Sequence, residues 1–185
     1  MANTNAIDYF TITSIGNATD FGNMTQQSRY PSCTDNGTNE RGISFGGADA
    51  HSNVIEYITI NSAGNATDFG DLTISINGAV SCSNSTNERG VVGGGTSQSN
   101  VIQYVTINSA GNATDFGDLT IGREGLFSAV SNGTGERGIF CSGNPIGAAI
   151  NRMDYITINT TGNATVFGSM RQPSVWTGGY SDCGT

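Results

Sequence analysis

The sequence predicts an all-β repeat protein, a β-propeller, and three observations lead to this fold. The stretch at residues 55–73 recurs almost unchanged at residues 102–120, with looser copies at 7–25 and 153–170. The glycines that precede each Asn-Ala-Thr follow one another at intervals of 48, 47 and 51 residues. The chain has 27 glycines among 185 residues and few helix formers, as short strands joined by tight turns require. Repeats of this length with four strands each are typical of propeller blades, whereas solenoid repeats are usually shorter.

The repeat at residues 55–101 shows the predicted elements in order. Residues 57–60 alternate apolar and polar side chains and are predicted as a strand, which a Ser-Ala-Gly-Asn turn follows. Residues 67–72 form a second strand anchored by a phenylalanine and a leucine. After a variable segment, residues 80–83 form a third strand. An Asn-rich turn leads to the fourth strand at residues 88–92, which three glycines close.

The four repeats, cut at residues 7–54, 55–101, 102–152 and 153–185, are expected to form a single domain. We count the strand that ends at the glycines as the second strand of its blade. The chain then begins with the last two strands of one blade. Three complete blades follow, and a lone strand is predicted near residues 175–181. A closed four-bladed ring therefore lacks one strand, and the open blade exposes unpaired backbone groups. We expect a homo-oligomer, or another protein of the same assembly, to pair there; the alternatives are a longer natural chain or an open ring.

The order of these parts resembles the kelch repeat. In that family a di-glycine ends the second strand, a tyrosine lies in the third and a large aromatic begins the fourth. Gly46-Gly47, Tyr57 and Phe69 occupy these places in order, and Gly93-Gly94, Tyr104 and Phe116 repeat the pattern. Phenylalanine stands where kelch repeats usually carry tryptophan. The resemblance covers the whole chain and implies a kelch-like propeller.

The amino-acid sequence of the repeats is similar to that of repeats in proteins from tailed bacteriophages, particularly cyanobacterial and other aquatic phages. The similarity is carried by NVIEYITINSAGNATDFGDLT followed by NERGVVGGG. Such proteins are suspected tail-fibre or virion-surface components. The resemblance therefore implies a location on the virion and a part in host attachment or assembly.

The charge of the chain argues against two classes of partner. The net charge is −8, from 15 carboxylates and 7 basic residues, and every basic residue is an arginine. Such a chain repels nucleic-acid phosphates and anionic lipids, so we expect no nucleic-acid binding and no membrane insertion. A neutral glycan on the host surface fits better.

The sequence offers little chemistry, and we expect no enzyme, cofactor or metal. His51 is the single histidine and lies in a polar loop, so neither a Ser-His-Asp set nor a histidine-ligated copper is available. Asn65, Asp68 and Asp71 suggest calcium, but the other repeats replace these residues, and turn hydrogen bonds explain them. The Glu-Arg pairs at 40–41, 88–89 and 136–137 are expected to form Arg–carboxylate contacts between blades. The four cysteines match no metal spacing and are either free thiols or cross-blade disulfides.

Recognition is expected where the connections differ between repeats. Connections at one end of the blades repeat, as in the Gly-Asn-Ala-Thr turns, whereas those at the other end differ in every copy. Variable loops on a constant scaffold are the usual place for binding. The candidate binding residues are the aromatic and arginine side chains there: Tyr30, Arg123, Phe127, Trp176 and Tyr180. The sequence thus predicts a non-enzymatic virion protein that binds through these loops, or alternatively a free lectin.

Overall fold

The computed structural model describes residues 4–47, 51–125, 128–145, 147–174 and 178–179, and these contain strands, turns and short 3-10 helices but no α-helix. The strands form one two-stranded and three four-stranded antiparallel sheets. The first sheet pairs β1 (Thr4–Tyr9) with β2 (Thr19–Ser28). The all-β class predicted from the sequence is confirmed. No helix in these ranges is long and apolar enough to cross a membrane.

Each four-stranded sheet is built from consecutive strands, which are the following. The second sheet contains β3 (Ser32–Asp35), β4 (Arg41–Phe45), β5 (Ser52–Thr59) and β6 (Thr67–Ile76). The third contains β7 (Val80–Ser83), β8 (Arg89–Gly93), β9 (Val101–Thr106) and β10 (Thr114–Asp118). The fourth contains β11 (Ser128–Ser131), β12 (Arg137–Cys141), β13 (Ile150–Thr157) and β14 (Thr165–Ser174).

This order agrees with the strand count from the sequence. Two strands come first, and three sets of four follow. Each four-stranded sheet draws its strands from two successive repeats, because the repeat boundaries fall inside the β5, β9 and β13 segments. The lone strand expected near residues 175–181 lies mostly outside the described residues.

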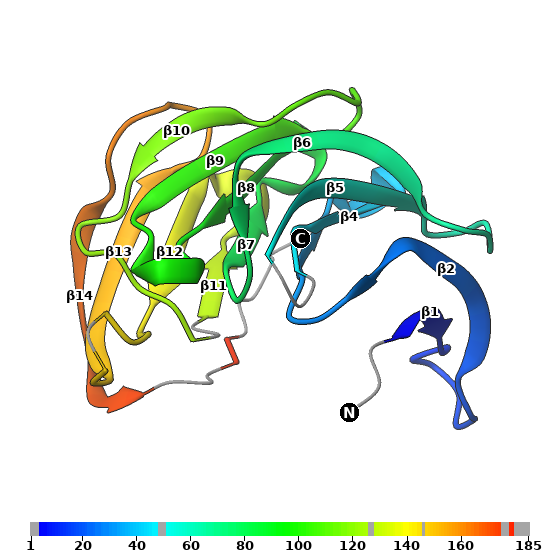
Figure 1. Ribbon diagram of the computed structural model, residues 1–185, viewed down its shortest axis with the longest axis horizontal. Helices are drawn as coiled ribbons and strands as arrows, with labels where there is room; N and C mark the ends of the chain where they lie inside the picture. The colour runs from blue at the N-terminus through cyan, green and yellow to red at the C-terminus, as the bar shows by residue number, and fades with distance from the viewer. Residues whose placement is uncertain (1–3, 48–50, 126–127, 146, 175–177, 180–185) are drawn as a thin grey trace.

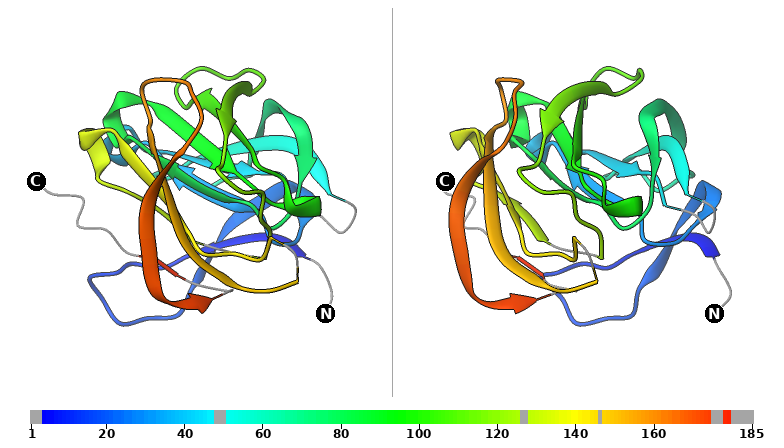
Figure 2. Two further views of the ribbon diagram at one scale, coloured as in Figure 1. Left: turned by 90° about the vertical axis from the view of Figure 1, so that its left-hand side faces the viewer. Right: turned by 60° about the vertical axis from the view of Figure 1, so that its left-hand side comes forward.

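The sheets follow one another along an arc in chain order, from β1–β2 at one end to β14 at the other (Figure 1). Strand β7 lies beside both β3 and β11, so the first strands of the three complete sheets meet on the inner side of the arc. Figure 2 (left) looks onto the last sheet, with β14 in front. Two apolar clusters hold the arc together, one between the second and third sheets and one between the third and fourth.

Local turn chemistry sets the strand ends. The predicted turn after β7 is the 3-10 helix Ser85–Asn87, and Glu88 then takes a left-handed conformation with φ 70°. Glu40 and Glu136 do the same after η1 (Gly37–Asn39) and η4 (Gly133–Gly135). The strand predicted at residues 88–92 therefore begins one residue later, at Arg89. β6 extends beyond its predicted end to Ile76 because β5 is long enough to pair with it.

Candidate functional site

The structure brings the differing connections together at one end of the sheets, which we call the varied end. It consists of the described residues 29–31, 46–47, 77–79, 94–100, 119–125 and 142–145. Backbone hydrogen bonds link these connections to one another: the Gly95 amide donates to the Arg123 carbonyl at 2.9 Å, and the Gly78 amide donates to the Tyr30 carbonyl at 3.2 Å. The 3-10 helices η1, η2 (Ser85–Asn87) and η4 pack together at the opposite, repeated end.

Tyr30 lies on the varied end as the sequence predicts. Its side chain is 40% exposed, and the Arg29 guanidinium carbon lies 5.1 Å from the centre of its ring. Its backbone φ is 56°, a left-handed conformation that residues other than glycine adopt only at a cost in free energy. An exposed aromatic ring on a constrained backbone is suited to stacking on a planar or sugar-like partner.

Arg123 corrects the expectation from the sequence. The residue belongs to the varied end, but its side chain is completely buried and cannot act as a surface binding residue. Its guanidinium forms an ion pair with the buried Asp154 carboxylate and donates to the Ser142 carbonyl at 3.0 Å. Burial lowers the pKa of the Arg123 guanidinium, and the Asp154 carboxylate opposes that shift.

The reason for this burial is a paired change between repeats. Glu56, Gln103 and Asp154 are equivalent, and each accepts a hydrogen bond from a threonine on the preceding sheet. The buried Ile76 is the equivalent of Arg123 in the preceding repeat, as the buried Gln103 is of Asp154. Where the chain changes Gln to the shorter, charged Asp, it also changes Ile to Arg. Comparing the repeats for charges that appear together would have found this pair from the sequence.

The other three candidates, Phe127, Trp176 and Tyr180, lie outside the described residues. The structure therefore brings only Tyr30 of the five predicted residues to the surface of the varied end, among the residues that it describes.

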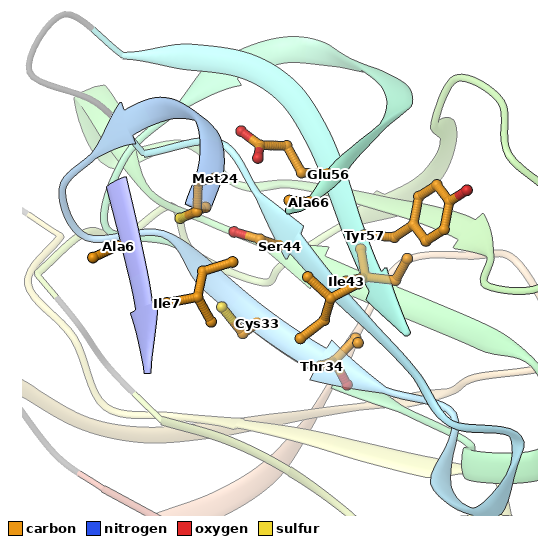
Figure 3. Close-up of a pocket in the computed structure, with 12 residues that line it drawn as sticks. Ala6, Ile7, Met24, Cys33, Thr34, Ile43, Ser44, Glu56, Tyr57 and Ala66 are labelled. Atoms are coloured by element: carbon orange, nitrogen blue, oxygen red, sulfur yellow. The ribbon is translucent and has the colours of Figure 1, made fainter. Parts of the chain in front are cut away.

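A cavity of about 270 Å³ between the first and second sheets was not predicted (Figure 3). Ile7 and Met24 line it from the first sheet, and Cys33, Ile43 and Glu56 line it from the second. Its walls are almost entirely apolar. The lining includes the buried Glu56 carboxyl, whose Oε2 accepts from the Thr25 backbone amide at 2.7 Å, while Oε1 has no hydrogen-bond partner among the described residues.

The cavity exists because the first sheet has only two strands. Between the second and third sheets, the second-sheet residues Ile43 and Phe45 fill the equivalent space from β4. The first sheet has no strand equivalent to β4 among the described residues, so its counterpart of this packing is missing. Ile60 is consequently 46% exposed, whereas the equivalent residues Ile107 and Ile158 are fully buried. The cavity is thus a packing gap beside an open sheet edge.

The Glu-Arg pairs link neighbouring sheets, but not as predicted. The guanidinium of Arg41 donates to the Ile107 carbonyl of the next sheet at 2.8 Å and stacks 4.3 Å from the Tyr57 ring. Arg89 donates to the Ile158 carbonyl at 3.0 Å in the same way. The expectation of Arg–carboxylate contacts is wrong for these residues because each arginine reaches a backbone oxygen. The carboxylates instead accept from asparagine side chains, as Glu88 does from Asn36 at 3.1 Å.

The remaining sequence candidates have structural surroundings that explain them. The Asn65 side-chain oxygen accepts from the Asn23 amide of the preceding sheet at 3.0 Å. His51 is exposed with φ 61°. Within the described ranges no three His, Cys, Asp or Glu residues gather as metal ligands. Cys33, Cys82 and Cys141 are free thiols, and Cys183 lies outside the described residues.

Comparison with known proteins adds no relationship: no protein-family model matches the chain, and no curated protein matches it.

Proposed function

We propose that the chain is a non-enzymatic, kelch-like β-propeller module of a bacteriophage virion, a tail-fibre or surface-appendage component that attaches to a host or assembles through its varied end. The observation that carries the proposal is the contrast between the two ends of the sheets. The connections at the repeated end have nearly one sequence, whereas those at the varied end share a place in the fold but not a sequence. Such a contrast is characteristic of a recognition surface on a scaffold.

Repeated contacts between sheets support the propeller arrangement. The same asparagine–amide hydrogen bond joins the first sheet to the second, the second to the third and the third to the fourth, at 3.0 Å each time. Equal contacts between successive units impose an equal rotation from one unit to the next, and this generates a curved array. Small-angle scattering from the purified chain tests this arrangement, because an extended solenoid would have a clearly larger radius of gyration.

The virion location is supported by the resemblance of the repeats to phage proteins. The direct test is an antiserum against the chain, applied to gradient-purified particles of the phage that encodes it. Labelling of particles by immunogold and co-migration of the chain with infectivity are expected. A chain found only in the soluble lysate would contradict the proposal.

Attachment through the varied end is tested with the isolated protein and host cell envelopes. Tyr30→Ala is expected to weaken binding by about tenfold, as loss of a stacking aromatic side chain does. Ser109→Ala changes an exposed residue in a turn at the repeated end and should leave binding unchanged. Equal effects of the two variants would contradict recognition at the varied end.

A free lectin is the alternative, and the exposed Tyr30 ring is the observation that favours it. A glycan array probed with the isolated chain separates the two functions. Saturable binding to one class of glycan, lost on Tyr30→Ala or Trp176→Ala, together with absence from particles, would identify a lectin.

A further inference from the structure

The three contacts between successive sheets share one backbone motif. A glycine near the start of the last strand of one sheet faces the carbonyl oxygen of a turn glycine in the next sheet. A Cβ at Gly70 would lie 2.5 Å from the Gly111 oxygen, and a Cβ at Gly117 would lie 2.5 Å from the Gly162 oxygen. The turn asparagine after each of these carbonyls then accepts a hydrogen bond from the strand, as Asn112 does from the Asp71 amide.

One copy of this motif is divided between the two ends of the arc. Gly168 of β14 is the equivalent of Gly70, but the nearest atom to its Cβ position is the Met153 methyl carbon at 3.7 Å. Gly16, in the turn after β1, is the equivalent of Gly111, but no glycine of the described residues has Gly16 among the atoms nearest to its Cβ position, whereas Gly70 has Gly111 there. The adjacent Asn17 is exposed. Each end of the arc therefore carries one half of the motif that joins the sheets elsewhere.

The apolar side chains around these two halves are exposed, whereas their equivalents are buried. In β14, Phe167 is 46% exposed, against 3% for Phe69 in β6. After β1, Ile12 is 90% exposed, against 0% for Ile107 after β9. Phe10 is 69% exposed for the same reason, because in the other sheets this position packs under the preceding sheet. Exposed apolar groups of this size on two faces indicate an interaction surface.

Polar side chains on the last sheet are also exposed where their equivalents in the earlier sheets contact the next sheet. Asn36 and Asn84 are fully buried because each donates to the next sheet, whereas the equivalent Asn132 is exposed. Arg137 stacks on Tyr155 like its equivalents but is exposed. In the earlier sheets this arginine donates to the carbonyl of the isoleucine that corresponds to Ile12. The last sheet thus presents donors for which the first sheet carries the matching acceptor.

We propose that the outward face of the β11–β14 sheet binds the outward face of the β1–β2 sheet of a second copy of this chain, which repeats the contacts between successive sheets. The repeats identify this partner. In the earlier sheets, the surface that packs against the equivalent of Phe167 corresponds to the surface that carries Phe10, Ile12, Gly16 and Asn17. Gly179 lies against Ser128 and Val130 of β11, but among the described residues the part of the last sheet that carries Phe167, and the face that carries Ile12, stay uncovered. Because the two faces differ, the association is head-to-tail and generates a closed ring or a filament of copies.

Sedimentation velocity over a range of protein concentrations tests the proposal. The wild-type chain is expected to form species larger than one chain as its concentration rises. Ile12→Glu, which blocks the face near β1, and Phe167→Glu, which blocks the face on β14, should each remain monomeric. Ile74→Glu makes the same change from apolar to acidic at a 37% exposed site on β6, outside both faces, and should associate like the wild type.

Mixing the two blocked variants gives the decisive result. Each variant keeps one intact face, so the mixture is expected to form a one-to-one dimer and nothing larger. A wild-type chain that stays monomeric at every concentration, or a mixture that does not pair, would overturn the proposal.

A second measurement is independent of the folding of the acidic variants. Asn17→Cys and Ser169→Cys place thiols where the asparagine and amide of the divided motif would meet. Mild oxidation of the double variant should give a ladder of covalently linked chains, with each single variant as control. A fast-migrating, internally linked monomer would show instead that the arc closes on itself, and the proposal would be wrong.

Discussion

Gly70 in β6 lies directly against the carbonyl oxygen of Gly111 in the turn between β9 and β10, so close that a Cβ on Gly70 would be 2.5 Å from that oxygen. The two glycines have unequal roles in this contact. Gly70 has φ 145° and must lack a side chain, whereas the Cβ position of Gly111 faces open space. The contact therefore depends on the glycine of the strand and on the backbone alone at the turn.

Gly70→Ala should consequently destabilise the protein by about 2–4 kcal/mol, because the added methyl both strains the backbone and forces two sheets apart. Gly111→Ala is the matched control from the same contact and should change stability by less than about 0.5 kcal/mol. Urea unfolding followed by far-ultraviolet circular dichroism measures both. Equal losses in the two variants would show that the close approach does not limit the packing.

Asn84 provides a test of the polar contacts between the third and fourth sheets. It is fully buried, and its amide donates to Glu136 at 3.2 Å and to Asn159 at 2.9 Å. Asn84→Asp replaces these donors by an acceptor and should cost about 2–3 kcal/mol at neutral pH. The exposed equivalent Asn132→Asp should cost less than about 0.5 kcal/mol.

The pH dependence of this loss has a definite sign. The introduced carboxyl lies beside Glu136, which disfavours its charged form in the folded protein. Protonation restores a donor and the folded pKa of the new carboxyl lies above its unfolded value, so the difference between the Asn84→Asp variant and the wild type should shrink as the pH falls towards about 4 and stay constant below it. A loss that grows on acidification would contradict this explanation.

The buried pair of Arg123 and Asp154 should show strong coupling. Arg123→Ile alone leaves a buried carboxylate without its main counter-charge and should cost about 3–5 kcal/mol. Asp154→Gln alone leaves the guanidinium uncompensated and should cost a similar amount.

The double variant transplants the Ile76 and Gln103 combination of the neighbouring sheets. It should recover most of the stability, since well-packed neutral groups commonly replace a buried ion pair at no loss. Denaturant unfolding of the two single variants and the double variant measures the coupling free energy. Additive losses would mean that the ion pair has no special role.

Thiol reactivity should separate the described cysteines. Burial raises the pKa of Cys82 to about 12, so at pH 8 almost none of it is the reactive thiolate. Cys33 is exposed to solvent at the cavity, although the surrounding protein also raises its pKa. Labelling of variants that keep a single cysteine should be faster for Cys33 than for Cys82, where it is limited by unfolding. Both should react alike in denaturant, which is the internal control.

Raised thiol pKa values also predict a loss of stability at alkaline pH. An unfolded cysteine loses its proton near pH 9, whereas folded Cys82 keeps it to about pH 12. Folding stability should therefore fall between these pH values, and Cys82→Ala should make that fall shallower.

Much of the fold was predictable because the strands and turns depend on local sequence patterns. Alternating side chains located β5, and the third predicted strand of the repeat coincides with β7. The glycine at position 70 could be recognised as recurrent, but the reason for it could not. Its partner, Gly111, belongs to another sheet, and only the packing of the sheets brings the two together.

The candidate site was less predictable because burial depends on residues distant in the chain. The sequence by itself determined the all-β class, the order of two strands followed by three sets of four, and the end at which connections differ. Each follows from short-range alternation and turn chemistry. Only the tertiary structure decided that Arg123 is inside while Tyr30 is exposed, that arginines reach carbonyls rather than carboxylates, and that Phe167 and Ile12 stay uncovered. These outcomes depend on how the sheets pack against one another. The residues adjacent to a side chain in the sequence do not determine that packing.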